Sequence, residues 1–249
     1  MPFSAELRDI DILRESLSAI AEIIDETEII IREDGIYMLA ADRAVVAVVD
    51  FFLSRGVFSE YSFEGEQRIG MNLMNLLRIL RRASPGDILR FTIEDGKMKF
   101  RLSGESVRTF SLPIIDVSKQ EMPDLEKLSF ASSFDISSEV LGSGIEDSDL
   151  ITDSLVFSVS SDRVLMAADS DLASFNMELK AGSPALRMLN GERAARARYS
   201  LDYLKRIMKA RRLSDTVKVQ LGPEYPAKFT YDIPEKARLS FVVAPRRDE

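Results

Sequence analysis

The sequence of 249 residues contains no cysteine, no histidine and no tryptophan. Without cysteine, the chain has no disulfides, no thiolate nucleophile and no cysteine-based zinc site. Without histidine, it lacks the commonest general base and metal ligand, and with them every Ser-His-Asp or Cys-His arrangement. Chemistry based on carboxylates, lysine or tyrosine is still open. These absences favour a binding protein over an enzyme, and we expect no metal and no cofactor.

Long hydrophobic runs are also missing. No segment reaches the roughly 18 uninterrupted apolar residues of a membrane span. Residues 1–6 are charged within a few positions and lack the apolar core of a signal peptide. We therefore expect a soluble, cytoplasmic protein that does not associate with membranes. Hydrophobic residues make up 45% of the chain and charged residues 30%, which is typical of globular domains.

Apolar periodicity and turn signals predict an α+β protein rich in antiparallel strands. We expect helices over residues 9–24, 73–82, 137–145 and about 200–211. The expected strands are 28–32, 36–41, 45–53, 88–94, 97–103, 107–115, 130–136, 154–160, 163–168, 172–179, 216–221, 227–233 and 237–243.

The chain reads as a duplicated unit. A shift of 128 residues places Leu73 on Leu201 and, without a gap, aligns a helix and the following strand in the two halves. Any two amphipathic helices followed by strands would align to some degree, which is the alternative explanation. Residues 116–128 are polar, contain Pro123 and lack a clean period, as a linker does. We predict domains at 1–115 and 129–249 joined by a connector at 116–128.

Positive charge is concentrated on two of the expected helices, although the chain has 33 basic and 41 acidic residues and a net charge of −8. Opposite the leucine stripe of residues 73–80 lie Arg78 and Arg82, with Arg81 on the flank. Residues 203–212 carry five cations and no acid. The pattern suits a polyanion held at one surface; a solvated helix face with cations near its C-terminal end explains it equally well. No aromatic residues are interleaved, so any DNA contact is expected to be phosphate-directed and sequence-independent.

Several pieces in this order and spacing resemble the proliferating cell nuclear antigen (PCNA) family of DNA sliding clamps, of the archaeal–eukaryotic type. The resemblance covers essentially the whole chain. The pieces that carry it are Glu-Asp-Gly-Ile at 33–36 running into Ala41-Asp42 and the next strand, Leu-Leu-Arg-Ile-Leu-Arg at 76–81, Leu-Pro-Ile-Ile-Asp-Val at 112–117, Tyr203-Leu204 through Lys209-Ala210, Leu-Ser-Asp-Thr-Val at 213–217 and Val-Ala-Pro-Arg at 243–246.

The resemblance implies a DNA-clamp fold of two similar domains. Three chains, either copies of this one or paralogues, would close head to tail into a pseudo-sixfold ring whose helices line a hole around duplex DNA. Such a protein is a polymerase processivity factor in replication and repair, and not an enzyme. The cations that would face the phosphates are Arg8, Arg14, Arg78, Arg81, Arg82, Lys205, Arg206, Lys209, Arg211 and Arg212.

The resemblance also implies a docking pocket beneath the connector. Polymerase, clamp loader, flap endonuclease and DNA ligase would bind it through a short peptide with an aliphatic and two aromatic anchors, the PIP box. Ala41 is smaller than the Met or Leu expected there. The matched pocket residues are Ala41, Val46, Val48, Met122, Pro123, Leu125, Pro226, Ala244 and Pro245.

Ring closure in this family pairs two sheet edges. On one chain the matched strand is Arg108, Thr109, Phe110, Ser111 and Leu112, and on the next chain it is Phe175, Asn176, Met177, Glu178 and Leu179. The sequence departs from the pattern in the helix after residues 134–136, which carries Glu139, Glu146 and Asp147 but no cation. DNA contact is therefore not carried over to that helix.

Two other functions are compatible with the sequence. One is a clamp-shaped scaffold that binds proteins but does not encircle DNA, and salt-dependent retention on DNA would argue against it. The other is a carboxylate–metal enzyme, for which the acids at 146, 147, 149 and 153 are dense enough to bind Mg²⁺. An acidic loop after a helix explains those four acids more simply.

Overall fold

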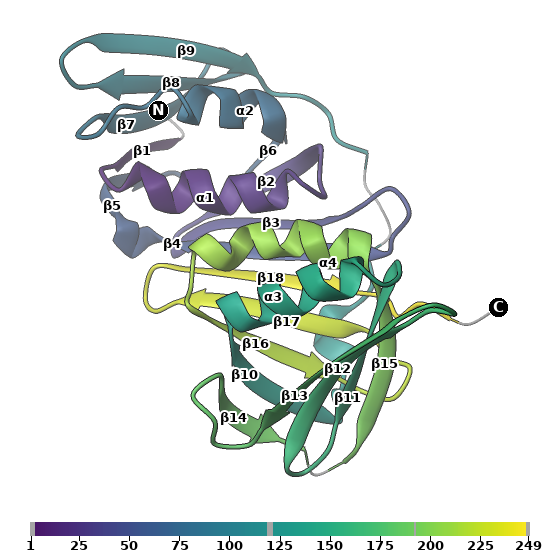
Figure 1. Ribbon diagram of the computed structural model, residues 1–249. Helices are drawn as coiled ribbons and strands as arrows, with labels where there is room; N and C mark the ends of the chain where they lie inside the picture. The colour runs from purple at the N-terminus through teal and green to yellow at the C-terminus, as the bar shows by residue number, and fades with distance from the viewer. Residues whose placement is uncertain (1–2, 119–121, 192, 248–249) are drawn as a thin grey trace. The chain divides into compact units, whose positions relative to one another are not determined.

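Antiparallel strands and four short α-helices make up residues 3–118, 122–191 and 193–247, the part of the chain that the computed structural model describes (Figure 1). These residues divide into two units. Unit 1 contains the residues before Asp42, residues 49–118 and Ile233–Leu239. Unit 2 contains Asp42–Val48, Met122–Asp232 and the residues from Ser240 onward. Residues 119–121 of the expected connector lie outside the described residues, as do positions 1, 2, 192, 248 and 249.

Unit 1 contains two antiparallel runs of strands and two helices. The first run has the order β5-β1-β7-β8-β9, and the second has the order β4-β3-β2-β6, with the first two residues of β4 counted in unit 2. Helices α1 and α2 pack beside each other. The elements are β1 (Phe3–Leu7), α1 (Ile10–Ile20), β2 (Glu26–Arg32), β3 (Gly35–Ala41), β4 (Ala47–Ser54), a 3₁₀ turn (Arg55–Val57), β5 (Phe58–Phe63), β6 (Gln67–Asn72), α2 (Leu73–Leu80), β7 (Ile88–Glu94), β8 (Lys97–Ser103) and β9 (Val107–Pro113).

Unit 2 repeats this plan. Its strand orders are β14-β10-β16-β17-β18 and β13-β12-β11-β15, with the first three residues of β18 counted in unit 1, and α3 packs beside α4. The elements are a 3₁₀ turn (Leu125–Lys127), β10 (Ser132–Ser137), α3 (Ser138–Asp149), β11 (Ser154–Val159), β12 (Arg163–Asp169), β13 (Ser174–Lys180), β14 (Leu186–Asn190), β15 (Ala195–Ser200), α4 (Leu201–Ile207), a 3₁₀ helix η3 (Met208–Arg212), β16 (Thr216–Leu221), β17 (Ala227–Ile233) and β18 (Ala237–Val243).

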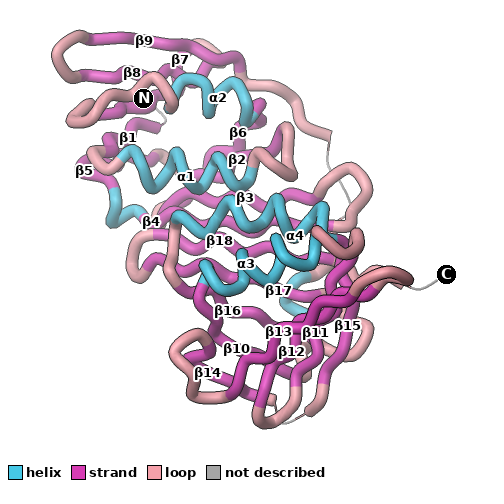
Figure 2. The backbone as a smooth tube through the Cα atoms, viewed as in Figure 1, coloured by secondary structure: helices cyan, strands magenta, loops and turns pink. Residues whose placement is uncertain are grey.

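The order of elements in the described residues is the same in both halves: strand, helix, five strands, helix, three strands (Figure 2). The shift of 128 residues holds at the element boundaries, because α2 and α4 begin at Leu73 and Leu201, and β7 and β16 begin at Ile88 and Thr216. This agreement confirms the predicted repeat. No helix in the described part of the chain is long and apolar enough to cross a membrane.

Each unit has its own aromatic core, which the alternation of buried and outward residues along the strands produces. In unit 1 the ring of Phe91 lies 6.0 Å from both Phe58 and Phe100. In unit 2 the ring of Phe157 lies 6.1 Å from Tyr199 and 6.3 Å from both Phe134 and Phe229. Edge-on and tilted rings at these separations are the favoured geometry for aromatic packing.

Several expected boundaries were wrong. Helix α1 ends at Ile20 rather than at residue 24, and the last turn of the expected helix 200–211 is the 3₁₀ helix η3. Helix α3 is longer than expected and reaches Asp149. Strand β4 begins at Ala47, two residues after the expected start, because the preceding residues form a hydrogen-bonded loop. Strands β1, β5, β6, β14 and β15 were not predicted; their apolar alternation is short, and cross-strand pairing decides their conformation.

Gly70 on β6 offers a test of the packing between this strand and Ile115, which follows β9 and forms an isolated bridge with Gly70. The N–H of Ile115 donates to the Gly70 carbonyl at 3.0 Å, and a Cβ at Gly70 would come 2.0 Å from the Ile115 carbonyl oxygen. We expect Gly70→Ala to destabilise the protein by about 1–3 kcal/mol through overpacking. At about 2–4 °C per kcal/mol in a protein of this size, the thermal midpoint should fall by several degrees.

The matched control is Gly56→Ala, where the nearest atom, Ser54 Oγ, would lie 3.4 Å from the new Cβ. Calorimetry of both variants at one protein concentration provides the comparison. Equal midpoints for the two variants would contradict the packing described at Gly70.

Candidate nucleic-acid and partner interfaces

The cationic face of α2 is exposed because its apolar face is buried. Its apolar side chains Leu73, Leu76, Leu77, Ile79 and Leu80 are buried, and Asn72 caps the helix by accepting a 3.0 Å hydrogen bond from Asn75 N–H. Arg78, Arg81 and Arg82 are exposed. No carboxylate in the described part of the chain forms an ion pair with these three arginines.

The two weaker candidates near α1 differ from each other. Arg8 is exposed, whereas Arg14 is partly buried and its guanidinium lies 2.7 Å from the Asp11 carboxylate and 3.8 Å from Glu15. Both arginines line a cavity of about 200 Å³ beside the loop Ser84–Asp87. Arg14 is therefore already neutralised within its own helix, and Arg8 is the more accessible cation.

Two of the five cations of α4 and η3 are paired with acids of α3. Lys205 Nζ lies 2.9 Å from both oxygens of Asp149, and Arg211 lies 3.1 Å from Glu146. Surface pairs of this kind contribute zero to about 1 kcal/mol, so they can exchange for a phosphate.

The other three cations of this segment are Arg206, Lys209 and Arg212. Arg206 pairs with Asp202 at 2.9 Å, one turn earlier in α4. Lys209 is exposed and forms no ion pair with any described residue, and Arg212 is also exposed.

The acids of the metal-enzyme alternative are dispersed among cations. Asp149 binds Lys205, Glu146 binds Arg211, and Asp153 accepts from Arg246 at 2.7 Å. Three of the four carboxylates thus already hold a cation of the chain, and this charge pairing favours the simpler explanation of an acidic α3.

The loop between β3 and β4 is organised by one side chain, Asp42. One of its carboxylate oxygens accepts from Val46 N–H at 2.7 Å and Ala47 N–H at 2.8 Å, and the other accepts from Tyr203 O–H at 2.7 Å. Burial and the Asp42 carboxylate raise the pKa of Tyr203 to about 12, so the hydroxyl donates throughout the neutral range. Val45 has a φ of 54°, a strained conformation for a β-branched residue.

The C-terminal tail runs from this loop to strand β15 through backbone hydrogen bonds. Ala244 N–H donates to the Val46 carbonyl at 2.8 Å, and Arg246 N–H donates to the Arg198 carbonyl at 2.7 Å. Loop, tail and β15 are therefore connected within unit 2.

The matched docking residues differ in exposure. Ala41 and Val48 are 6% and 3% exposed, so they can support a pocket but contribute little surface. The others present accessible surface: Val46, Met122, Pro123, Leu125, Pro226, Ala244 and Pro245.

The two strands matched to ring closure are both terminal in their strand order. β9 pairs on one side with β8, and β13 pairs on one side with β12. Each contains seven residues with alternating exposure. The side chain of Arg108 is turned to its own unit, where it bonds the Asp87 carboxylate and donates to the Arg82 carbonyl at 2.8 Å.

Three features of these surfaces were not predicted from the sequence. These are the role of Asp42, its hydrogen bond from Tyr203, and the pairing of α3 acids with α4 cations. The density of acids in 135–171 beside five cations in 203–212 is the sequence signal for the last of these. No local pattern indicates the other two.

Comparison with known proteins matches the two halves to one family. Residues 2–120 match the N-terminal domain of proliferating cell nuclear antigen, and residues 124–246 match its C-terminal domain. A "DNA polymerase sliding clamp" of Methanothermobacter thermautotrophicus is 33% identical over 248 residues, covering 98% of both chains. One of Thermococcus sibiricus is 30% identical over 250 residues, covering 100% of both chains.

A solved structure has the same fold. The crystal structure of PCNA from Thermococcus kodakaraensis superposes with a TM-score of 0.89 at 24% sequence identity, covering 98% of this chain and 100% of that one. Two α+β domains with antiparallel sheets, matched end to end, define the class of protein. The chain belongs to the proliferating cell nuclear antigen family, which confirms the resemblance and agrees with the expectation of a protein without catalytic activity.

Asp42 and Tyr203 provide a test of how the loop is held. We expect Tyr203→Phe to lower stability by about 1.5–3 kcal/mol, because a hydrogen bond to a charged group is removed. Asp42→Ala should cost more, since it also leaves the N–H groups of Val46 and Ala47 without their acceptor. Thermal unfolding of both variants measures which of them loses more stability. Tyr203→Phe at wild-type stability would contradict the role assigned to this bond.

Proposed function

We propose that the chain is a DNA polymerase sliding clamp, a non-catalytic ring that encircles duplex DNA and raises the processivity of the polymerase. The observation that carries the proposal is the match of both halves to PCNA domains, supported by relatives named DNA polymerase sliding clamps over nearly their whole length. These relatives come from archaea, so we place the protein in the cytoplasm of such a cell.

Ring closure joins β9 of one chain to β13 of the next. In support, both are terminal strands of seven residues, and an unpaired edge of that length is an aggregation risk unless it is covered. A head-to-tail contact whose rotation closes yields a ring rather than a filament. The contact residues are Arg108–Leu112 and Phe175–Leu179.

DNA contact is made by the helix cations, and not by all of them equally. Arg78, Arg81, Arg82 and Lys209 contribute most, since they form no ion pair with any described residue. The paired cations Lys205, Arg206, Arg211 and Arg14 contribute less, because a phosphate must first displace a carboxylate. Arg8 and Arg212 are exposed and add to the positive electrostatic potential that attracts the phosphates. Because the contacts are made only with phosphates, no base sequence binds the ring more tightly than another. The ring can therefore slide along the DNA.

Replication and repair proteins dock on the surface formed by the tail, the loop after β3 and the segment around Leu125. Polymerase, clamp loader, flap endonuclease and DNA ligase are the expected partners, each through a PIP-box peptide. The partly exposed apolar and proline side chains Val46, Leu125 and Pro245 support this, because a few anchors in a small pocket suit exchangeable partners.

The first test is the assembly state. Light scattering of the purified chain at several concentrations, in low and high salt, should give three times the 28.0 kDa mass of one chain. A mass of 28.0 kDa at every concentration would contradict a ring of identical chains. If that mass then tripled on adding paralogues, the ring would be heteromeric.

The second test addresses the DNA-facing cations. Arg78→Glu with Lys209→Glu should weaken binding to short linear duplex DNA and flatten its salt dependence, by about 0.9 in log–log slope for each phosphate that is no longer neutralised. Glu146→Gln with Asp149→Asn should have the opposite effect, because Arg211 and Lys205 are released from their carboxylates. Binding is followed by fluorescence anisotropy across a salt series.

Both double variants should keep the assembly state of the wild type, which light scattering checks. If Arg78→Glu with Lys209→Glu left DNA binding unchanged, the assignment of these cations would be wrong. If the wild type itself showed no salt-dependent retention on DNA, a protein-binding scaffold would be the better description.

A further inference from the structure

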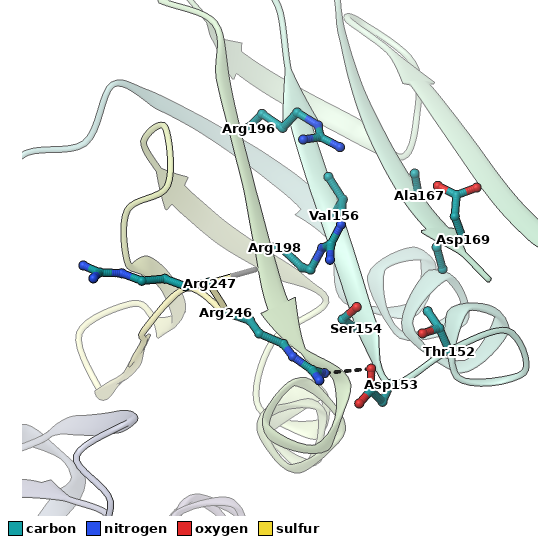
Figure 3. Close-up of a pocket in the computed structure, with 11 residues that line it drawn as sticks. Thr152, Asp153, Ser154, Val156, Ala167, Asp169, Arg196, Arg198, Arg246 and Arg247 are labelled. Atoms are coloured by element: carbon teal, nitrogen blue, oxygen red, sulfur yellow. Dashed lines mark ion pairs between the residues drawn. The ribbon is translucent and has the colours of Figure 1, made fainter. Parts of the chain in front are cut away.

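A cavity of about 620 Å³ in unit 2 is lined by more cations than acids (Figure 3). Its wall carries Arg196 and Arg198 of β15 and Arg246 of the tail, and Figure 3 shows Arg196 and Arg198 projecting from one strand. Its acids are Asp153 and Asp169. Its volume lies within the range of roughly 300–1,000 Å³ typical of ligand sites. In a chain of net charge −8, a concave cationic surface is unexpected.

The cavity exists because small side chains lie between larger ones on the outward face of the sheet. Val156 of β11 stands opposite Arg198 of β15 on one side and Ala167 of β12 on the other. Ser154 continues the same row along β11. Because Val156, Ala167 and Ser154 are much shorter than the arginines beside them, they form the floor of the cavity and the arginines form its wall.

The spacing of the arginines matches an extended peptide. Arg196 and Arg198 are two residues apart on one face of β15, a separation of about 7 Å at a rise of about 3.4 Å per residue. Carboxylates at alternate positions of an extended segment have the same separation. Arginine binds carboxylates through two parallel hydrogen bonds, which makes this pairing both strong and directional.

The acids in the cavity favour a peptide over a nucleic acid. Asp153 accepts from Arg246 at 2.7 Å, a hydrogen bond that lowers the pKa of Asp153. A peptide can donate its backbone N–H groups to Asp153 and Asp169. A phosphodiester backbone offers only acceptors, so it has no donor for these carboxylates.

The tail connects this cavity to the proposed docking surface. Ala244 bonds to Val46 in the docking region, and Arg246, two residues later, bonds to β15 and to Asp153. A peptide bound at Ala244 and Pro245 therefore has the cavity within the reach of a few residues. Arg247 lies at the rim and points away from the strands in Figure 3.

We propose that this arginine cavity binds an acidic segment flanking the docking peptide of a partner, with Arg196 and Arg198 as its carboxylate receptors. The proposal rests on the proposed function for the peptide pocket itself. The cavity would let the protein distinguish, by charge, between partners that carry the same apolar anchors. Partners with an acidic flank would be favoured, most strongly at low salt.

Synthetic PIP-box peptides with different flanks provide the test. Peptides carrying Glu-Ser-Glu-Ser before or after the anchors are compared with peptides carrying Gln-Ser-Gln-Ser, by fluorescence anisotropy. On the wild type, one acidic peptide should bind about tenfold tighter than its neutral counterpart. The gain should fall below about twofold in Arg196→Ala with Arg198→Ala. It should persist in Arg187→Ala, a matched removal of an exposed cation on β14 outside the cavity.

The outcomes separate this inference from the proposed function. No gain on the wild type, or an undiminished gain in Arg196→Ala with Arg198→Ala, would overturn the cavity assignment. If no peptide with anchors binds, the pocket assignment fails. A (Glu-Ser)₄ peptide without anchors then tests the cavity assignment by itself. Binding that depends on Arg196 and Arg198 supports the assignment, and no binding overturns it. The same variants are tested with a single-stranded DNA oligonucleotide. If these arginines are needed for binding the oligonucleotide but not for binding any peptide, the cavity is a nucleic-acid site and the peptide proposal is overturned.

Discussion

The burial of one apolar stripe on each short helix is the constraint on which the rest of the structure depends. The helices contain 7 to 12 residues, and helices of that length are marginal in water unless they pack against something. Leu76 and Leu80 of α2, and Leu201 and Leu204 of α4, are buried, so the opposite faces must be exposed. Those faces carry the arginines and lysines. The packing that makes the helices stable is therefore also what presents the cations, and the fold and the proposed DNA-facing surface have one cause.

The cations in the two halves of the repeat are balanced differently. In unit 1, Arg78, Arg81 and Arg82 have no carboxylate partner among the described residues, whereas in unit 2 the acids of α3 pair with Lys205 and Arg211. Exposed pairs contribute little free energy and exchange readily. An acidic helix beside a basic one thus lowers the attraction for a polyanion without abolishing it. For a protein proposed to move along DNA, a weak and exchangeable contact is of more use than a tight one.

The Asp42 side chain and two backbone hydrogen bonds connect the surfaces proposed for partners. Asp42 holds the loop after β3, the loop accepts the tail at Ala244, and the tail reaches β15 at Arg246. These links place the proposed docking surface and the arginine cavity along the same C-terminal tail in unit 2. The family match covers this region.

The sequence by itself determined the repeat, the stripes of the helices, the excess of cations on two of them and the family. All of these depend on patterns within a few residues of each other or on the order of motifs along the chain. Tertiary structure decided the strands such as Phe58–Phe63 and Leu186–Asn190, whose conformation depends on their neighbours in the sheet. It also decided the pairing of Lys205 with Asp149, 56 residues away, and the role of Asp42, which Tyr203 contacts across 161 residues. Periodicity reports which face of an element is buried, but not which distant residue meets it there, because that contact is made only when the elements pack.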